Sequence, residues 1–490
     1  MEFPQYDELY VVSDLHMGGA HADFQILRET DRLARFIRWV AEQRPGDRVA
    51  LVLNGDVVDT LAEDVEGYVA VENAVAVVGG ILARPSFAPV WDALADLVQT
   101  PRRALVIVVG NHDVELAFPT VQHLILSRLA GENLEARARV EFATVGAGYT
   151  CVVGTARVFC THGNEVDPWN YVRYEDLSRA ARRLNCGRSL DPSDWEPNAG
   201  TKMVKEVMNE VKRSYAWIDL LKPETQAAVG VLLVLDPSQV GKITRLPAIV
   251  GELARGAREY DGRLGAEGFV SPSSATSRGA SVAQLLGAHL AEGLTAGADD
   301  MLLAAEQNYQ TPRPARSPED ATLGAPRLIW DRITGWITGV GKDEALRRAL
   351  LDWLADDKTF DVDVRDDTFK RVTASIGDGI DFVVTGHTHL ERAIDMGGGR
   401  YYFNCGTWIR LLRFTNAMLE DTAAFRPVYD VLADGKMSTI DAASFGGAPF
   451  VLDRTSAVCI KTDPRGVVGS LVHVDGTGRT VTSVTDFVRP

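Results

Sequence analysis

The sequence has few cysteines, no excess of basic residues and no long apolar run. Its five cysteines are spread over 490 residues without a Cys-x-x-Cys pair. An odd number at irregular spacing argues against a disulfide framework and favours a reducing compartment. No stretch reaches the roughly 18 apolar residues that a membrane span needs. The first residues also lack the basic and apolar segments of a signal peptide. We therefore expect a cytoplasmic protein without a transmembrane segment.

The negative net charge limits which partners the protein is expected to bind. The formal net charge is −16, with 46% hydrophobic and 24% charged residues. These percentages are ordinary for a folded globular protein. A strongly negative chain is unlike proteins that coat nucleic acid, which usually present a basic face. We expect no stable nucleic-acid complex, although a single phosphodiester could still be met at a metal.

Short apolar runs predict the core strands. Near-continuous apolar, β-branched segments are typical of strands buried on both faces. Helical spacing at 27–43 and 87–98 separates several of them, which predicts parallel pairing and helix-covered sheets. Three further strands are expected near the C-terminus. The predicted strands are 9–13, 49–53, 104–109, 156–160, 382–384, 401–403, 457–461, 467–473 and 480–488.

A long, mainly helical insertion interrupts this strand-rich core. We place the core in residues 1–168 and 380–490, and the insertion, a candidate lid, in residues 169–379. Gly, Ser, Pro and Ala dominate 265–279, and four prolines lie in 310–326, so both stretches are expected to be flexible. The predicted helices of the insertion are 174–184, 202–220, 240–260, 282–307 and 344–355.

Acidic, amide and imidazole side chains follow five of the predicted strands. In open α/β sheets, ligands bind outside the carboxyl ends of the strands. Each motif alone has a plainer interpretation, such as a turn, a helix cap or a core histidine. Together they place five of the nine histidines directly after strands, which predicts a metal site. The motifs are Asp14-Leu15-His16, Gly55-Asp56-Val57-Val58-Asp59, Gly110-Asn111-His112-Asp113, His162-Gly163 and Gly386-His387-Thr388-His389.

The order of these motifs resembles the calcineurin-like metallophosphoesterases. The resemblance covers about 9–167 and 380–408. It implies an α/β fold of two mixed sheets packed as a sandwich flanked by helices. It also implies two divalent ions that share Asp56 and a bridging hydroxide that attacks phosphorus. Oxygen and nitrogen ligands without thiolate suit Mn²⁺, our first choice, or Fe, Zn²⁺, Co²⁺ or Ni²⁺. The implied ligands are Asp14, His16, Asp56 and His389 for one ion, and Asp56, Asn111, His162 and His387 for the other.

The same resemblance suggests roles around the metals. His112 would face the leaving group as an acid or hydrogen-bond donor, and Asp59 would orient its ring. Arg173, Arg392 and Asn404 are candidate substrate contacts. A solvated helix face for the arginines, and a tight turn for Asn404, are the alternatives.

Two local features bear on the substrate. Thr60 stands where the protein phosphatase branch carries the arginine that grips phosphate, which argues against protein dephosphorylation. Residues 13–19 resemble bacterial hydrolases that cleave the pyrophosphate of UDP-diacylglucosamine. We therefore expect hydrolysis of a small or lipid-linked phosphoester or pyrophosphate, which allows peripheral membrane contact. The alternatives are a phosphodiesterase or nuclease acting on nucleotides or nucleic acid, and a non-catalytic metal-bound interaction module. The sequence does not indicate an oligomeric state.

Overall fold

The computed structural model describes residues 3–65, 67, 73–167, 169–189, 195–221, 341–354 and 360–490. The helices expected at 240–260 and 282–307 lie outside these residues, as do the stretches 265–279 and 310–326. The chain forms two compact units. The first comprises Met1–Thr201, Phe360–Arg410 and Asp453–Pro490, and the second comprises Lys202–Thr359 and Leu411–Leu452. These bounds differ from the domain bounds expected from the sequence, because 411–452 joins the second unit.

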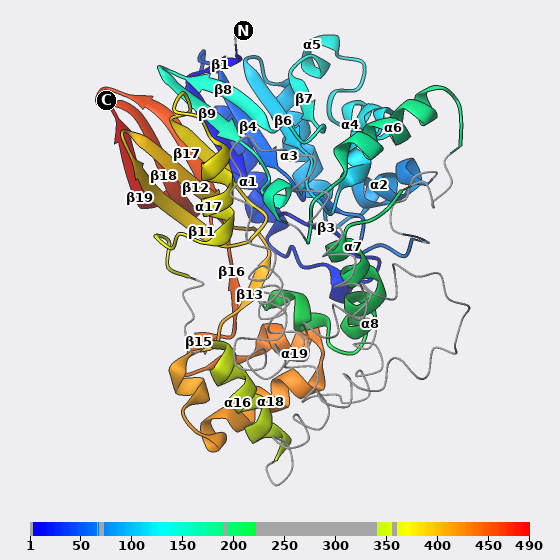
Figure 1. Ribbon diagram of the computed structural model, residues 1–490, viewed down its shortest axis with the longest axis vertical. Helices are drawn as coiled ribbons and strands as arrows, with labels where there is room; N and C mark the ends of the chain where they lie inside the picture. The colour runs from blue at the N-terminus through cyan, green and yellow to red at the C-terminus, as the bar shows by residue number, and fades with distance from the viewer. Residues whose placement is uncertain are drawn as a thin grey trace, which may run out of the picture. The chain divides into compact units, whose positions relative to one another are not determined.

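A seven-stranded mixed sheet forms one layer of the first unit (Figure 1). Four of its strands run parallel, and three at the C-terminus run antiparallel. In sheet order the strands are β19 (Val481–Arg489), β18 (Gly466–Val474), β17 (Ser456–Asp463), β2 (Glu8–Val12), β4 (Val49–Asn54), β6 (Arg103–Val108) and β7 (Val140–Ala143).

A six-stranded mixed sheet forms the second layer. Strand β10 pairs in parallel with β9 and β12, and its Phe382 lies opposite Val158 and Tyr401. Thus segments more than 200 residues apart in sequence become neighbours. In sheet order the strands are β1 (Gln5–Tyr6), β8 (Tyr149–Val153), β9 (Ala156–Cys160), β10 (Phe382–Thr385), β12 (Arg400–Cys405) and β11 (Glu391–Gly397).

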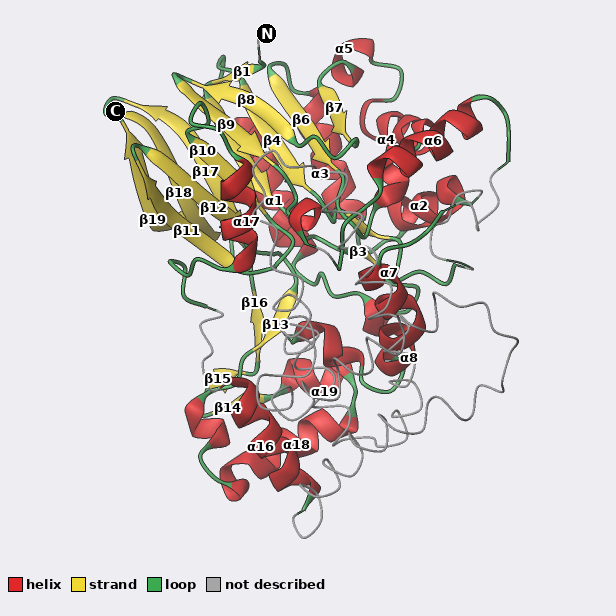
Figure 2. Cartoon of the chain, in the orientation of Figure 1, coloured by secondary structure: helices red, strands yellow, loops and turns green. Residues whose placement is uncertain are grey.

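Alternating side chains bind the layers together, because neighbours on a strand point to opposite faces. Leu9 and Val11 of β2 enter a core shared with the six-stranded sheet. Tyr10 and Val12 instead pack in a core with helices α1 (Thr30–Glu42), α3 (Ala88–Gln99) and α4 (Pro119–Ala130). Figure 2 shows the sheets in yellow and these helices in red. The predicted sandwich of two mixed sheets flanked by helices is confirmed.

The remaining elements of the first unit are short. Helix α17 (Asp367–Ser375) packs on the six-stranded sheet, where the rings of Phe369 and Tyr402 lie 5.0 Å apart. The others are β3 (Met17–Gly18), β5 (Val58–Asp59), α2 (Ala74–Ala83), α5 (Leu134–Arg137) and α6 (Tyr174–Asn185). Within the described part of the chain, no single helix has the length and apolarity of a membrane span. The bent pair α2 and α3 meets those criteria only when taken together.

The described part of the second unit is mainly helical. The single helix expected at 202–220 is wrong in detail: α7 (Ala199–Met203) passes through a π-helical turn (Val204–Met208) into α8 (Asn209–Lys212), and a 3₁₀-helix (Ala216–Leu220) follows. Trp217 of the 3₁₀-helix donates from its ring nitrogen to the carbonyl oxygen of Leu432 at 3.1 Å. The other elements are α16 (Lys342–Leu354), α18 (Thr422–Asp434), α19 (Met437–Ala442), β14 (Ser444–Phe445) and β15 (Ala448–Pro449), with β13 (Arg410–Leu412) and β16 (Val451–Asp453) at its bounds.

The inter-sheet core gives a stability prediction. Phe382 is fully buried, with its ring centroid 5.5 Å from that of Tyr401 and 6.4 Å from that of Phe403. Phe382→Ala should lower the free energy of unfolding by about 3–5 kcal/mol, because it leaves a cavity between the sheets. Urea denaturation measures this. Val484→Ala, at a side chain 38% exposed, should cost less than about 0.5 kcal/mol. Equal costs for the two variants would contradict the assigned core.

Candidate metal centre

The predicted motifs meet at one edge of the sandwich. Strands β2, β4 and β6 are parallel and in register, so the turns that follow them begin side by side. The turn after β2 is tied to the turn after β4, because Asp14 N donates to Gly55 O at 3.1 Å and His16 N to Asp56 O at 2.9 Å. The six-stranded sheet contributes the turns after β9 and β10. All seven predicted metal ligands therefore belong to the first unit.

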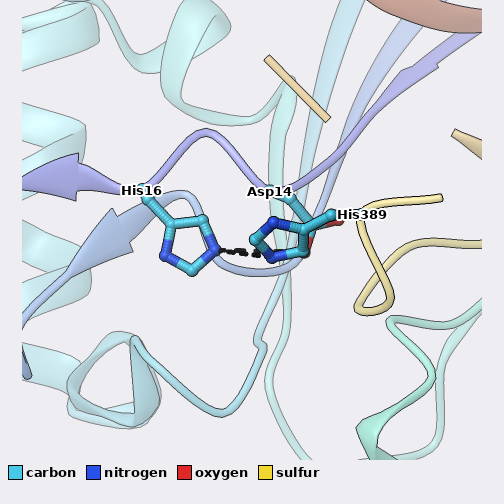
Figure 3. A group of neighbouring side chains, drawn as sticks. All are labelled: Asp14, His16 and His389. Atoms are coloured by element: carbon cyan, nitrogen blue, oxygen red, sulfur yellow. Dashed lines mark hydrogen bonds and ion pairs between the residues drawn. The ribbon is translucent and has the colours of Figure 1, made fainter. Parts of the chain in front are cut away.

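Asp14, His16 and His389 form a buried group that could hold one ion. Figure 3 shows the two imidazole rings turned toward each other beside the carboxylate. The Nε2 atoms of His16 and His389 lie 3.1 Å apart, and Asp14 Oδ1 lies 3.2 Å from His389 Nε2. The residues come from both sheets of the sandwich.

A second group, Asp56, His162 and His387, could hold another ion. His162 Nε2 lies 3.1 Å from Asp56 Oδ2, while its Nδ1 donates to the carbonyl oxygen of Asn54 at 2.8 Å. That bond fixes the tautomer and directs the Nε2 lone pair into the cluster. Asp56 Oδ2 is also 3.7 Å from His16 Nε2, so this carboxylate lies beside both groups.

Asp59 joins two histidines behind the cluster. Its Oδ1 lies 3.2 Å from His112 Nδ1, as predicted from the motif, and its Oδ2 lies 3.2 Å from His16 Nδ1. The His112 side chain is 19% exposed, against 3% for His16. His112 is therefore the one of these two imidazoles that a bound molecule can reach.

The backbone is strained where the cluster forms. Seven described residues other than glycine have a positive φ, and five of them are predicted ligands: Asp14, His16, Asp56, His387 and His389. Each left-handed residue of this kind costs about 1–2 kcal/mol. Strain of this size persists only where surrounding contacts enforce it, and it concentrates at functional sites.

Two motif glycines leave room for the carboxylates. A Cβ atom at Gly110 would overlap Asp56 Oδ1, and one at Gly386 would lie 2.6 Å from Asp14 Oδ2. Both glycines thus let the backbone of one turn approach the carboxylate of another. The third and fifth motifs need glycine for this close packing.

The buried carboxylates of the cluster favour a positive charge beside them. Burial alone would raise the pKa of Asp56, but His162 and His112 hold it well below its usual range. Burial lowers the pKa of His162, yet the neighbouring Asp56 raises it to about 10. The carboxylates thus stay ionised and attract whatever cation can enter.

Three buried side-chain atoms fit a bound cation. Asp14 Oδ1, Asn111 Oδ1 and His162 Nε2 are among the buried side-chain atoms of the described residues that make no hydrogen bond. Asp14 Oδ1 and His162 Nε2 nevertheless lie at ion-pair distances of 3.2 and 3.1 Å from His389 and Asp56. All three are lone-pair donors from predicted ligands. Two ligands of one ion at about 2.1 Å lie roughly 3.0–3.4 Å apart, which matches the separations of 3.1–3.2 Å within each group. The donor set therefore fits divalent metal ions.

The predicted substrate residues lie in closed environments. Asn404 is fully buried and donates to Gly386 O at 2.7 Å and to Thr388 Oγ1 at 3.1 Å, so it supports the last metal-binding turn. Arg392 is 2% exposed and donates to Asp366 at 2.9 Å. The predicted substrate contacts of Asn404 and Arg392 are not supported, because partners inside the fold engage both side chains.

Arg173 and Asp113 have different surroundings. Arg173 is partly buried and donates to Glu196 at 2.6 Å, and its contact with a substrate stays a prediction. Asp113 accepts from Gly110 N at 2.6 Å and from Val57 N at 2.7 Å. Asp113 therefore stabilises its own turn through Gly110 and ties the third motif to the second through Val57.

Sequence reasoning missed Asp167. Its Oδ2 lies 2.8 Å from His387 Nε2, and the same side chain accepts from Trp169 N and Asn170 Nδ2. Its position, five residues after His162, was the available signal. Asp167 holds an imidazole that the last motif supplies from a distant part of the chain.

Metal loading gives a prediction that needs no activity assay. Mn²⁺ at about 1,000 times its dissociation constant should stabilise the first unit by about 4 kcal/mol, because only the folded state assembles the ligands. Differential scanning calorimetry should show a rise in Tm that EDTA reverses. Asp14→Asn should remove most of this rise, whereas Asp378→Asn, at a fully exposed carboxylate, should keep it. An equal rise in the two variants would refute this assignment of the site.

The comparisons with known proteins agree with this geometry. The model of the calcineurin-like phosphoesterase family matches residues 8–207. This range holds the first four motifs, and the structure brings the fifth, from β10, against them. No curated protein matches the chain. This match and the assembled motifs support membership of the calcineurin-like metallophosphoesterase superfamily and indicate a metal-dependent phosphoric ester hydrolase.

Proposed function

We propose that the protein is a dinuclear phosphoesterase that hydrolyses a small or lipid-linked phosphoester or pyrophosphate. One observation carries the dinuclear proposal. The same Asp56 oxygen lies 3.1 Å from His162 Nε2 and 3.7 Å from His16 Nε2. A carboxylate placed between two imidazole groups can serve two ions at once, which is how two-metal sites are held about 3.5–4 Å apart.

The ligands divide between the two ions as their contacts suggest. Asp14, His16, Asp56 and His389 would hold one ion, and Asp56, Asn111, His162 and His387 the other. When bound, the ions would lower the pKa of water and so supply a nucleophile for attack at phosphorus. Nitrogen and oxygen donors without thiolate suit Mn²⁺, Fe or Zn²⁺. We propose Mn²⁺ first.

His112 would act on the leaving group. Its side chain is 19% exposed, against 9% for His387 and 3% for His16, and Asp59 lies 3.2 Å from its Nδ1. This contact fixes the ring and leaves Nε2 to donate to the departing oxygen. A purely structural metal site would need neither residue, which disfavours a non-catalytic interaction module.

The substrate class rests on local sequence and charge. Residues 13–19 resemble hydrolases of a lipid-linked pyrophosphate, and Thr60 replaces the arginine of protein phosphatases. The net charge of −16 disfavours long nucleic acids. We propose that the protein acts in the cytoplasm, with peripheral membrane contact where its substrate is lipid-linked.

A panel of phosphoesters with added Mn²⁺ tests the proposal. It should include p-nitrophenyl phosphate, bis-p-nitrophenyl phosphate, a nucleoside-diphosphate-linked pyrophosphate, a cyclic nucleotide and a short single-stranded DNA. Asp56→Asn should lose at least 99% of turnover, roughly the hundredfold effect of a lost electrostatic contact, and at least one ion by metal analysis. Asp378→Asn should keep its turnover and its metal content. A preference for the DNA would favour the nuclease alternative, and no turnover despite full loading would refute the proposed activity.

The role of His112 has its own test. His112→Asn should lower kcat by about 10²–10⁴-fold for an alkyl ester, because general acid catalysis contributes about that much. The loss should be smaller for p-nitrophenyl esters, whose leaving group needs little protonation. Metal content should not change. An equal loss with both leaving groups would show that His112 does not donate to the departing oxygen.

A further inference from the structure

His112 is fixed at three points by the turn that follows β4. Its backbone N donates to Asp56 Oδ1 at 2.9 Å, and its ring Nδ1 lies 3.2 Å from Asp59 Oδ1. The third contact is at the carbonyl oxygen, which accepts from Thr60 N at 3.2 Å and lies 2.9 Å from Thr60 Oγ1. Asp56 and Asp59 belong to the family motif, whereas Thr60 stands outside it.

A buried carboxylate completes the third contact. Glu115 is 1% exposed, and its Oε2 lies 2.7 Å from Thr60 Oγ1. The hydroxyl has one proton, which cannot serve the carbonyl and the carboxylate fully at the same time. The bond to Glu115 is the shorter of the two, at 2.7 Å against 2.9 Å, so the proton is assigned to it. The Thr60 N–H remains to hold the His112 carbonyl.

The link closes a ring of contacts around His112. Glu115 lies in the 3₁₀-helix η2 (Val114–Ala117), which begins two residues after His112. Its bond to Thr60 therefore ties the chain after His112 to the turn that contacts His112 from the other side. Thr60 is only 2% exposed, so its hydroxyl is turned inward and cannot meet a substrate.

We propose that Thr60 and Glu115 form a positioning clamp for His112. The inference rests on the proposed function, in which His112 meets the leaving group. Neither residue touches substrate, and both act through the position of the His112 backbone. A displacement of about 1 Å in a reacting group can lower the rate by up to about a hundredfold. In this proposal Thr60 positions His112, whereas the arginine at the same motif position in protein phosphatases binds phosphate.

Thr60→Val tests the clamp, because it keeps the branched shape and the N–H but removes the hydroxyl. We expect kcat to fall about tenfold for an alkyl phosphoester, and less for a p-nitrophenyl ester, with KM and metal content unchanged. Thr60→Ser should recover most of the loss. Glu115→Gln, which keeps one acceptor oxygen and replaces the other with an amide nitrogen, should give an intermediate kcat.

Thr455→Val is the matched control. Thr455 is also buried, at 5% exposure, and its hydroxyl donates to the carbonyl oxygen of Val474 at 2.9 Å. The substitution removes a hydrogen bond that involves none of the proposed metal ligands. If Thr60→Val and Thr455→Val lower kcat equally for both esters, the clamp is overturned and only general destabilisation remains.

A second measurement separates the clamp from the proposed activity. Amide hydrogen exchange, read by mass spectrometry on a peptide containing 111–115, should speed up in Thr60→Val and not in Thr455→Val. This result is expected whether or not the wild type turns over any ester of the panel. Unchanged exchange in Thr60→Val would overturn the clamp, whereas an inactive wild type would overturn only the proposed activity.

Discussion

The burial of carboxylates at one edge of the sandwich is the constraint on which the site depends. Asp14, Asp56 and Asp59 are each at most 5% exposed. A carboxylate oxygen of each lies within 4.0 Å of a ring nitrogen of His16. Buried charges are costly unless they are paired with opposite charge or coordinate a metal. The surrounding imidazoles meet part of this need, and bound cations would meet the rest. The left-handed residues and close-packed glycines of the turns can be understood as the backbone conformations that this crowding of charge requires.

The packing of the two sheets is therefore part of the chemistry. The two groups proposed to hold the ions combine residues from both layers: Asp14 and His16 meet His389, and Asp56 meets His162 and His387. The spacing between these ligands is set by how the sheets lie on each other, and apolar residues such as Phe382 and Val384 fill that interface. Because such cores are packed like crystals, they hold the ligand positions to a fraction of an ångström. A change in the inter-sheet core should thus be felt at the metals before it unfolds the protein.

The strands and motifs could be predicted because their signals are local. Strand β9, for example, coincides with the predicted 156–160, and the side chains after it need only their neighbours to be identified. The misses depend on partners far away in sequence. Arg392, a candidate substrate contact by sequence, donates to Asp366, and Asp167 contacts His387; neither partner is a close neighbour in sequence. The break of the helix expected at 202–220 and the helices of 411–452 likewise depend on tertiary packing, which overrides local propensity.

Asp59 connects a proposed metal ligand to the proposed proton donor. One carboxylate oxygen orients His112 and the other orients His16, a proposed ligand. Burial would raise the pKa of Asp59, but His112 and His16 hold it well below its usual range, so the carboxylate stays available to both rings. The positions of the proposed metal ligand His16 and of the proposed proton donor His112 are then set by the same group. Any shift of Asp59 must move both, which ties metal affinity to proton delivery within a single turn of the chain.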